Sequence, residues 1–171
     1  MHLSAYNSAK DFELKYCANL QTNAVVLDFG SYDHNGSLKP IFSRYKYIGV
    51  DIEHGPNVDL VIQGRKTPLL DNSIDVITSS SCFEHDEMFW VTFLEMCRLV
   101  KPNGFIYLNA PSTGPYHAYP IDCWRFQKDS YKALETWANY SNYKIELVES
   151  YICEENQFWL DNVGIFKKLP N

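Results

Sequence analysis

Two neighbouring stretches of the chain decide its fold class. Residues 68–85 read PLLDNSIDVITSSSCFEH, and residues 94–112 read LEMCRLVKPNGFIYLNAPS. In the first stretch, a turn leads into the apolar, β-branched run at 74–78, which predicts a strand. In the second, the Lys-Pro-Asn-Gly turn at 101–104 ends a helical pattern and leads into another apolar strand at 105–110. A strand, an amphipathic helix and a second strand in this order favour a parallel sheet with crossover helices.

The rest of the chain repeats these patterns. Short apolar runs predict further strands at 24–30, 47–51, 58–62, 143–152 and 161–167. Helical spacing of apolar residues predicts helices at 4–19, with Ser4 as a candidate N-cap, at 86–100 and at 128–140. Because the strand runs are continuous rather than alternating, both faces of the sheet should be covered. We therefore predict a doubly wound α/β sheet.

Composition is that of one globular domain. The chain has 171 residues, of which 46% are hydrophobic and 21% charged. We predict a single domain over 1–171, with an N-terminal helix in 1–20, a ligand-binding core in 24–110 and an aromatic substrate loop in 111–126. No apolar run has the length of a membrane-spanning helix, and the N-terminus has no signal-peptide pattern, so we expect a cytoplasmic protein.

Charge and metal-ligating residues exclude several functions. Fifteen Lys+Arg against twenty-one Asp+Glu give a net charge of −6, which disfavours a nucleic-acid partner because a phosphate backbone requires a basic face. Neither the cysteines nor the histidines have metal-site spacing, and we predict no structural metal. These scattered residues are Cys17, Cys82, Cys97, Cys123, Cys153, His2, His34, His54, His85 and His117.

Polar residues at the carboxyl ends of the first two strands indicate a nucleoside ligand. Asp28 and Gly30 end the first strand, and Asp51 ends the second, about twenty residues later, at the spacing that places an acid on ribose hydroxyls. The dinucleotide fingerprint GxGxxG is absent, because Tyr32 occupies the position of the second glycine. An adenosine ligand without a pyrophosphate is therefore favoured over NAD or FAD.

The order of these motifs resembles the class I S-adenosylmethionine-dependent methyltransferases, in particular the methyltransferase type 11 group. Besides the two stretches quoted above, VVLDFGS at 25–31 and YIGVDIE at 47–53 carry the resemblance. It implies a mostly parallel seven-stranded Rossmann-like sheet with helices on both faces and the last strand antiparallel. It also implies S-adenosylmethionine as the cofactor.

The resemblance assigns the cofactor contacts position by position. Asp51 matches the acid on the ribose diol, Ile52 the residue that packs on adenine, and Gln63 the position that often pairs with the adenine amino group. The positions that line the methionine part of the cofactor are Asp28, Gly30, Ser31, Ser79 and Ser80.

The aromatic segment after the fifth strand supplies candidates for the acceptor side. His117 and His85 are the candidate general bases, since an imidazole titrates near neutral pH, and Asp122 is the third choice. Candidate substrate contacts are Tyr116, Tyr119, Trp124 and Arg125, but for two of them a structural role is favoured: Arg125 should pair with a local acid such as Asp122, and Trp124 should anchor the loop in the core.

Two functional hypotheses follow, and a third possibility is that the chain binds the cofactor but uses it differently, for example by cleaving it. The first is a methyltransferase that acts on oxygen or nitrogen of a small-molecule or glycan-like acceptor. The second is a protein of the same fold that has no catalytic activity and serves as a regulatory or interaction subunit, because fold alone does not establish function. The sequence leaves the acceptor and the oligomeric state open, a homodimer included.

Overall fold

A seven-stranded sheet forms the centre of the computed structural model, which describes residues 2–155 and 158–170. Its strand order is β3-β2-β1-β4-β5-β7-β6, and β7 runs antiparallel to both of its neighbours while the first five strands are parallel. The strands are β1 (Val25–Phe29), β2 (Lys46–Asp51), β3 (Leu60–Val61), β4 (Ile74–Ser80), β5 (Val100–Pro111), β6 (Ile145–Cys153) and β7 (Asp161–Lys168). The predicted sheet, with its last strand antiparallel, is confirmed.

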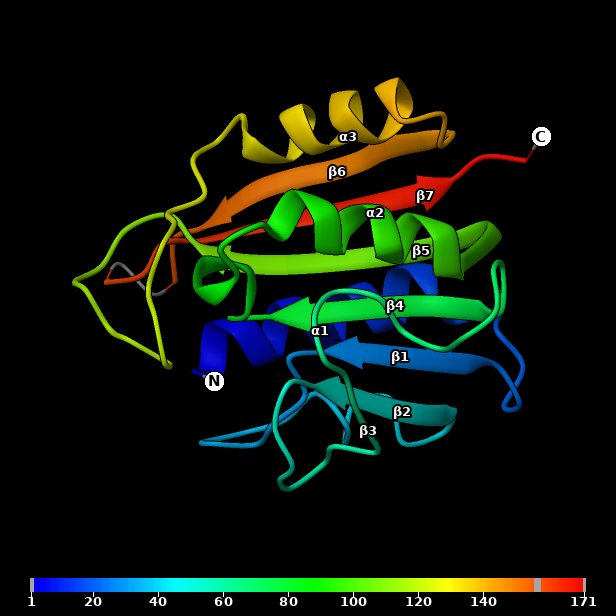
Figure 1. The fold of residues 1–171 in the computed structure, drawn as a ribbon, viewed down its shortest axis with the longest axis horizontal. Helices are drawn as coiled ribbons and strands as arrows, with labels where there is room; N and C mark the ends of the chain where they lie inside the picture. Colours follow the sequence, from blue (N-terminus) through cyan, green and yellow to red (C-terminus); the bar gives the residue numbers. More distant parts are fainter. Residues whose placement is uncertain (1, 156–157, 171) are drawn as a thin grey trace.

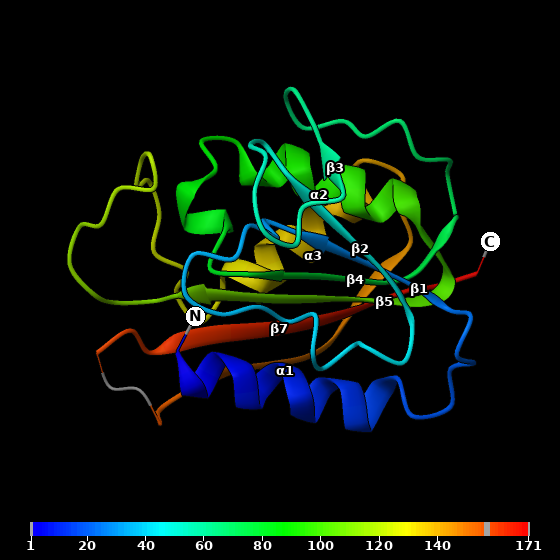
Figure 2. The same cartoon turned by 90° about the horizontal axis from the view of Figure 1, so that it is seen from below.

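Helices cover both faces of the sheet, as Figure 2 shows. Helix α1 (Leu3–Tyr16) lies on one face, while α2 (Phe89–Leu99) and α3 (Ser130–Tyr140) lie on the other. On the α1 face, the ring of Phe12 packs against Tyr107 of β5 at 5.0 Å between centroids. On the opposite face, Phe93 of α2 packs against Phe166 of β7 at 4.8 Å. Buried side chains on both faces explain why the strand sequences are continuously apolar.

The N-terminal helix differs in detail from its prediction. It begins at Leu3 and ends at Tyr16, three residues before the predicted end. His2 occupies the N-cap position, and Ser4 lies inside the first turn. The Ser4 hydroxyl donates to the buried carboxylate of Asp161, 3.4 Å away, so a tertiary contact has replaced the predicted cap. The other two helices lie within their predicted ranges.

The crossovers on one side of the sheet contain no helix, contrary to the simple doubly wound expectation. Residues 30–45, between β1 and β2, are irregular apart from turns at 38–45, where Leu38 and Phe42 are buried against the sheet. The Lys-Pro-Asn-Gly turn also lies within β5 rather than before it. Ile74 pairs with Val100 and Val76 with Phe105, so residues 101–104 bulge out of the strand.

The carboxyl ends of β1, β2 and β4 point to the same edge of the sheet, and the long segment after β5 extends beyond that edge (Figure 1). The strand order reverses between β1 and β4, which is where α/β sheets open a crevice for ligands. Across the described residues, no helix combines the length and apolar character that crossing a membrane requires.

Candidate functional site

A cleft of about 680 Å³ opens at this edge of the sheet. Its walls come from the ends of β1, β2 and β4, from the 3₁₀ helix η1 (Phe83–His85), and from the segment that follows β5. His2 and Asp161, from opposite ends of the chain, also line it. The fold therefore brings together the segments in which the sequence placed its ligand-binding residues.

Gly30 lines the cleft and has a conformation that favours glycine. Its φ is +75°, and a Cβ there would lie 2.6 Å from both Cβ and Sγ of Cys82. The amides of Gly30 and Ser31 donate to the carbonyl of Val50 at 2.9 and 3.2 Å, which fixes the turn against β2. The Ser31 hydroxyl is buried without a hydrogen-bond partner among the described residues.

Asp51 ends β2 at the mouth of the cleft, and backbone amides hold its carboxylate in place. Tyr32 N–H donates to Oδ2 at 3.0 Å, and Ile52 N–H donates to Oδ1 at 2.7 Å. Glu53 N–H also lies 3.4 Å from Oδ1, a long contact, so Oδ2 retains a free lone pair and Oδ1 has one that is only weakly engaged. The Ile52 side chain, 58% exposed, lies beside it on the cleft wall and offers an apolar surface.

Asp28 lies deeper in the cleft and is 4% exposed. Tyr47 Oη donates to one of its carboxylate oxygens at 2.5 Å, and Thr78 Oγ1 donates to the other at 2.8 Å. Burial raises the pKa of Asp28 to about 6, although both hydrogen bonds favour the ionised form.

The remaining predicted cofactor residues are divided between the cleft and its surroundings. Ser80 lines the cleft, whereas Ser79 is buried beside it, and neither hydroxyl has a partner among the described residues. Gln63 is exposed and lies outside the cleft lining, although its neighbour Ile62 is part of that lining.

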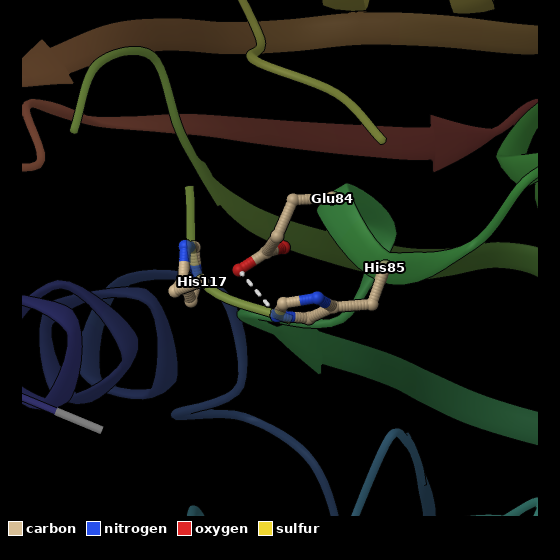
Figure 3. A group of neighbouring side chains, drawn as sticks. All are labelled: Glu84, His85 and His117. Atoms are coloured by element: carbon tan, nitrogen blue, oxygen red, sulfur yellow. Dashed lines mark ion pairs between the residues drawn. The ribbon is translucent and has the colours of Figure 1, made fainter. Parts of the chain in front are cut away.

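The two predicted bases lie close together, with Glu84 between them (Figure 3). One ligand atom from each of Glu84, His85 and His117 lies within 4.8 Å of the other two. His85 Nδ1 lies 2.6 Å from the carbonyl of Ile121 and donates to it, and its Nε2 lies 3.6 Å from Glu84 Oε1. Burial lowers the pKa of His85, which keeps its ring neutral.

Glu84 is the acid of this cluster, and it is deeply buried. Its side chain is 1% exposed, and Oε2 has no hydrogen-bond partner among the described residues. Burial, together with the charge of Asp161, raises the pKa of Glu84 to about 8. The Asp161 carboxylate is itself buried and pairs with His2.

Asp122 acts on His117 from outside the cleft lining. Its Oδ2 accepts from the His117 backbone N–H at 2.8 Å and lies 3.2 Å from Nδ1 of the same ring. The Arg125 guanidinium donates to both Asp122 oxygens, at 2.6 and 2.7 Å, and this pairing holds the pKa of the carboxyl well below its usual range. The expected local pairing of Arg125 with Asp122 is therefore confirmed.

The aromatic candidates take different positions. Tyr119 lines the cleft and reaches across it, with its ring 4.6 Å from His34, which in turn stacks on Tyr32. Tyr116 is 75% exposed and does not line the cleft. Trp124 packs against Phe89 and donates from Nε1 to the carbonyl of Asp86, so it anchors the segment to α2.

Comparison with known proteins agrees with the fold. Residues 36–108 match the family model of the methyltransferase domain. Among solved structures, 1,6-didemethyltoxoflavin-N1-methyltransferase of Burkholderia thailandensis, with bound 1,6-didemethyltoxoflavin and S-adenosylhomocysteine, aligns with a TM-score of 0.73 and 17% identity over 97% of this chain and 79% of that one. The chain therefore has the Rossmann-like fold of the class I methyltransferases, and residues 36–108 carry the sequence pattern of the methyltransferase domain.

Two further solved structures align with slightly lower scores. Phosphoethanolamine N-methyltransferase 2 of Haemonchus contortus, in complex with phosphomonomethylethanolamine and S-adenosylhomocysteine, gives a TM-score of 0.64 at 14% identity over 97% of this chain and 53% of that one. A chain of the complex between the Haloferax volcanii Trm112 methyltransferase activator and a methyltransferase gives 0.64 at 15%, over 98% and 96%. A search of curated proteins gives no match.

Several residues of the cleft were not among the predicted site residues of this methyltransferase fold. Glu84 precedes the predicted base His85 in the sequence, and its burial could be seen only in the structure. Tyr32 and His34 lie in the first loop, where their stacking had no sequence signal. His2 and Asp161 are separated by 159 residues and meet only because α1 packs beside β7.

Proposed function

We propose that this protein is a methyltransferase that transfers the methyl group of S-adenosylmethionine to an oxygen or nitrogen atom of a small-molecule or glycan-like acceptor. The observation that carries the proposal is Asp51, whose carboxylate is held by backbone amides at the mouth of the switch-point cleft. Two structurally similar methyltransferases are described with bound S-adenosylhomocysteine, which supports the choice of cofactor.

The cleft residues fit the parts of this cofactor. Asp51 would accept the two ribose hydroxyls, and Ile52 would pack on the adenine ring. Gln63, next to the cleft, is the candidate partner of the adenine amino group. The methionine part would lie over Gly30, near residues with unpaired or carboxylate oxygens. These residues are Asp28, Ser31, Ser79 and Ser80.

On the acceptor side, the acceptor atom would attack the methyl carbon of the sulfonium in line with the carbon–sulfur bond. The acceptor atom forms a bond to the methyl carbon, the carbon–sulfur bond breaks, and S-adenosylhomocysteine leaves. A proton must pass from the acceptor to a base. His117, oriented by Asp122, and the neutral His85 are the candidates for that base.

The aromatic segment would position the acceptor and exclude water from it. Tyr119 is best placed for a direct contact because it lines the cleft. Tyr116 and Trp124 remain candidates through movement of the same segment. Arg125 would act by holding Asp122 in place, as its paired guanidinium indicates.

Calorimetric titration with S-adenosylhomocysteine, S-adenosylmethionine and NAD tests the proposal. The two adenosyl compounds should bind, and NAD should not. Asp51→Asn should weaken binding at least tenfold, since one charge-assisted hydrogen bond contributes about 1.5–3 kcal/mol. Glu53→Gln, an exposed acid two residues away, is the matched control and should leave the affinity unchanged.

The outcomes distinguish an active methyltransferase from a protein that has the same fold but no catalytic activity. Binding followed by methyl transfer to members of an acceptor panel supports the proposal. Binding that persists unchanged in Asp51→Asn contradicts the assigned cofactor position. Absence of binding at millimolar ligand contradicts the proposal and favours a regulatory or interaction subunit, in which the bridge from Tyr32 to Tyr119 closes the cleft.

A further inference from the structure

The cluster in Figure 3 has the composition of a metal site rather than that of a simple acid–base pair. It offers one carboxylate and two imidazoles, the donor set that suits divalent transition metals. The 3.6 Å between His85 Nε2 and Glu84 Oε1 is close to the spacing of about 3.3 Å between two ligands of a tetrahedral ion with bonds of 2.0–2.1 Å.

Each ring can supply an unprotonated nitrogen to a ligand. His85 donates its Nδ1–H to the carbonyl of Ile121, so the lone pair of the neutral ring is on Nε2, which faces Glu84. His117 Nδ1 lies 3.2 Å from two acceptors, the carbonyl of Pro115 and the carboxylate of Asp122, and 3.4 Å from the Arg125 donor Nη2. The two shorter contacts favour the proton on Nδ1 and the lone pair on Nε2. Such outer hydrogen bonds are typical of metal-binding histidines.

Glu84 supplies a second, independent indication of a ligand. Its carboxylate points toward the space between the two rings (Figure 3), and its side chain is 1% exposed. A buried carboxylate oxygen without a partner is costly, and Oε2 has none among the described residues. A bound cation would compensate this cost.

The surrounding charges also favour a cation. Arg125 is the nearby positive group, but both oxygens of Asp122 neutralise it. The buried acid Asp161, close enough to Glu84 to act on its charge, adds negative potential, which its pairing with His2 reduces.

We propose that Glu84, His85 and His117 bind a divalent transition-metal ion at the acceptor end of the cleft, with at least one coordination position left for the acceptor. An acceptor hydroxyl bound to such an ion would lose its proton more readily than a free one. The imidazoles would then act as ligands instead of bases, and oxygen would be favoured over nitrogen as the methylated atom.

Titration of the full chain with Co²⁺ and Zn²⁺ after chelator treatment, followed by calorimetry and visible absorption, tests this site. We expect one ion per chain, with nitrogen and oxygen ligands in the Co²⁺ spectrum. His85→Ala and His117→Ala should each weaken binding at least tenfold. Glu84→Gln retains the size of the side chain and should also weaken it. His54→Ala, an exposed histidine elsewhere, is the matched control and should leave the affinity unchanged.

Three results would overturn the inference: no saturable binding, equal weakening by His54→Ala, or a thiolate-to-cobalt charge-transfer band that assigns the ion to a cysteine. Circular dichroism of each variant excludes unfolding as the cause of lost binding. Because metal binding is measured without cofactor, its failure is distinct from failure of the proposed methyl transfer, which the S-adenosylhomocysteine titration reports.

Discussion

Asp28 is a buried acid whose replacement by asparagine should stabilise the fold at neutral and alkaline pH. Burial raises its pKa from 3.8 to about 6. A raised pKa means that the folded state holds the proton more tightly than the unfolded state. The stabilising contribution is therefore complete below pH 3.8 and is lost as pH rises through about 6.

The size of the effect follows from the shift. A difference of about two pKa units corresponds to about 3 kcal/mol of stability lost to the ionised carboxylate above pH 7. Asparagine has the same shape, carries no charge and can still bond with Tyr47 and Thr78, which contact both oxygens of the aspartate. We expect Asp28→Asn to gain up to about 3 kcal/mol at pH 8 and about half of that at pH 5.

Urea unfolding of both proteins at pH 8 and pH 5, followed by circular dichroism, measures this difference. Asp75→Asn is the matched control, because Asp75 bonds with Val25 N–H and with Lys101 Nζ at the start of the neighbouring strand. The control should lose stability at both pH values. If Asp28→Asn is less stable than the wild type at pH 8, desolvation does not dominate the energetics of this carboxyl, and the reasoning is refuted.

Three further substitutions test other parts of the site. Gly30→Ala should destabilise the fold by about 1–3 kcal/mol in urea unfolding, because its Cβ would meet Cys82 at 2.6 Å and its φ is positive; unchanged stability would show that the turn can shift freely. His2→Ala should cost about 1–3 kcal/mol by leaving the buried Asp161 with only the long hydrogen bond from Ser4, whereas His2→Gln should recover part of that loss. Arg125→Ala should increase hydrogen exchange across residues 114–125, because the buried carboxylate it pairs with is left uncompensated; unaltered exchange would mean that the aromatic packing alone orders the segment.

Local sequence was enough to locate most elements of the fold. The apolar runs that became β1, β4 and β7 are buried on both faces, and such runs leave few alternatives to a covered strand. The ends of elements were predicted less well. Ser4 has the chemistry of an N-cap, but a hydrogen bond to Asp161, distant in sequence, outweighed that local preference.

The cofactor side of the site could likewise be predicted from the sequence, because each of its parts is formed by a short stretch of the chain. Gly30 and Asp51 each stand at the end of their own strand, and parallel strands bring their carboxyl ends to one edge. The acceptor side could not be predicted in the same way. His85 and His117 were chosen for their chemistry, and nothing in their spacing indicated that their rings lie 4.9 Å apart.

The sequence by itself determined which strands form, which residues end them and which ligand class suits those ends, since each property depends on short-range patterns of apolar and polar residues. Only the tertiary structure decided the burial of Glu84, its position between two histidines and the meeting of His2 with Asp161. The physical reason is that desolvation and the proximity of charges depend on which distant segments pack together. The spacing of residues within one segment gives no information about desolvation or about the proximity of distant charges.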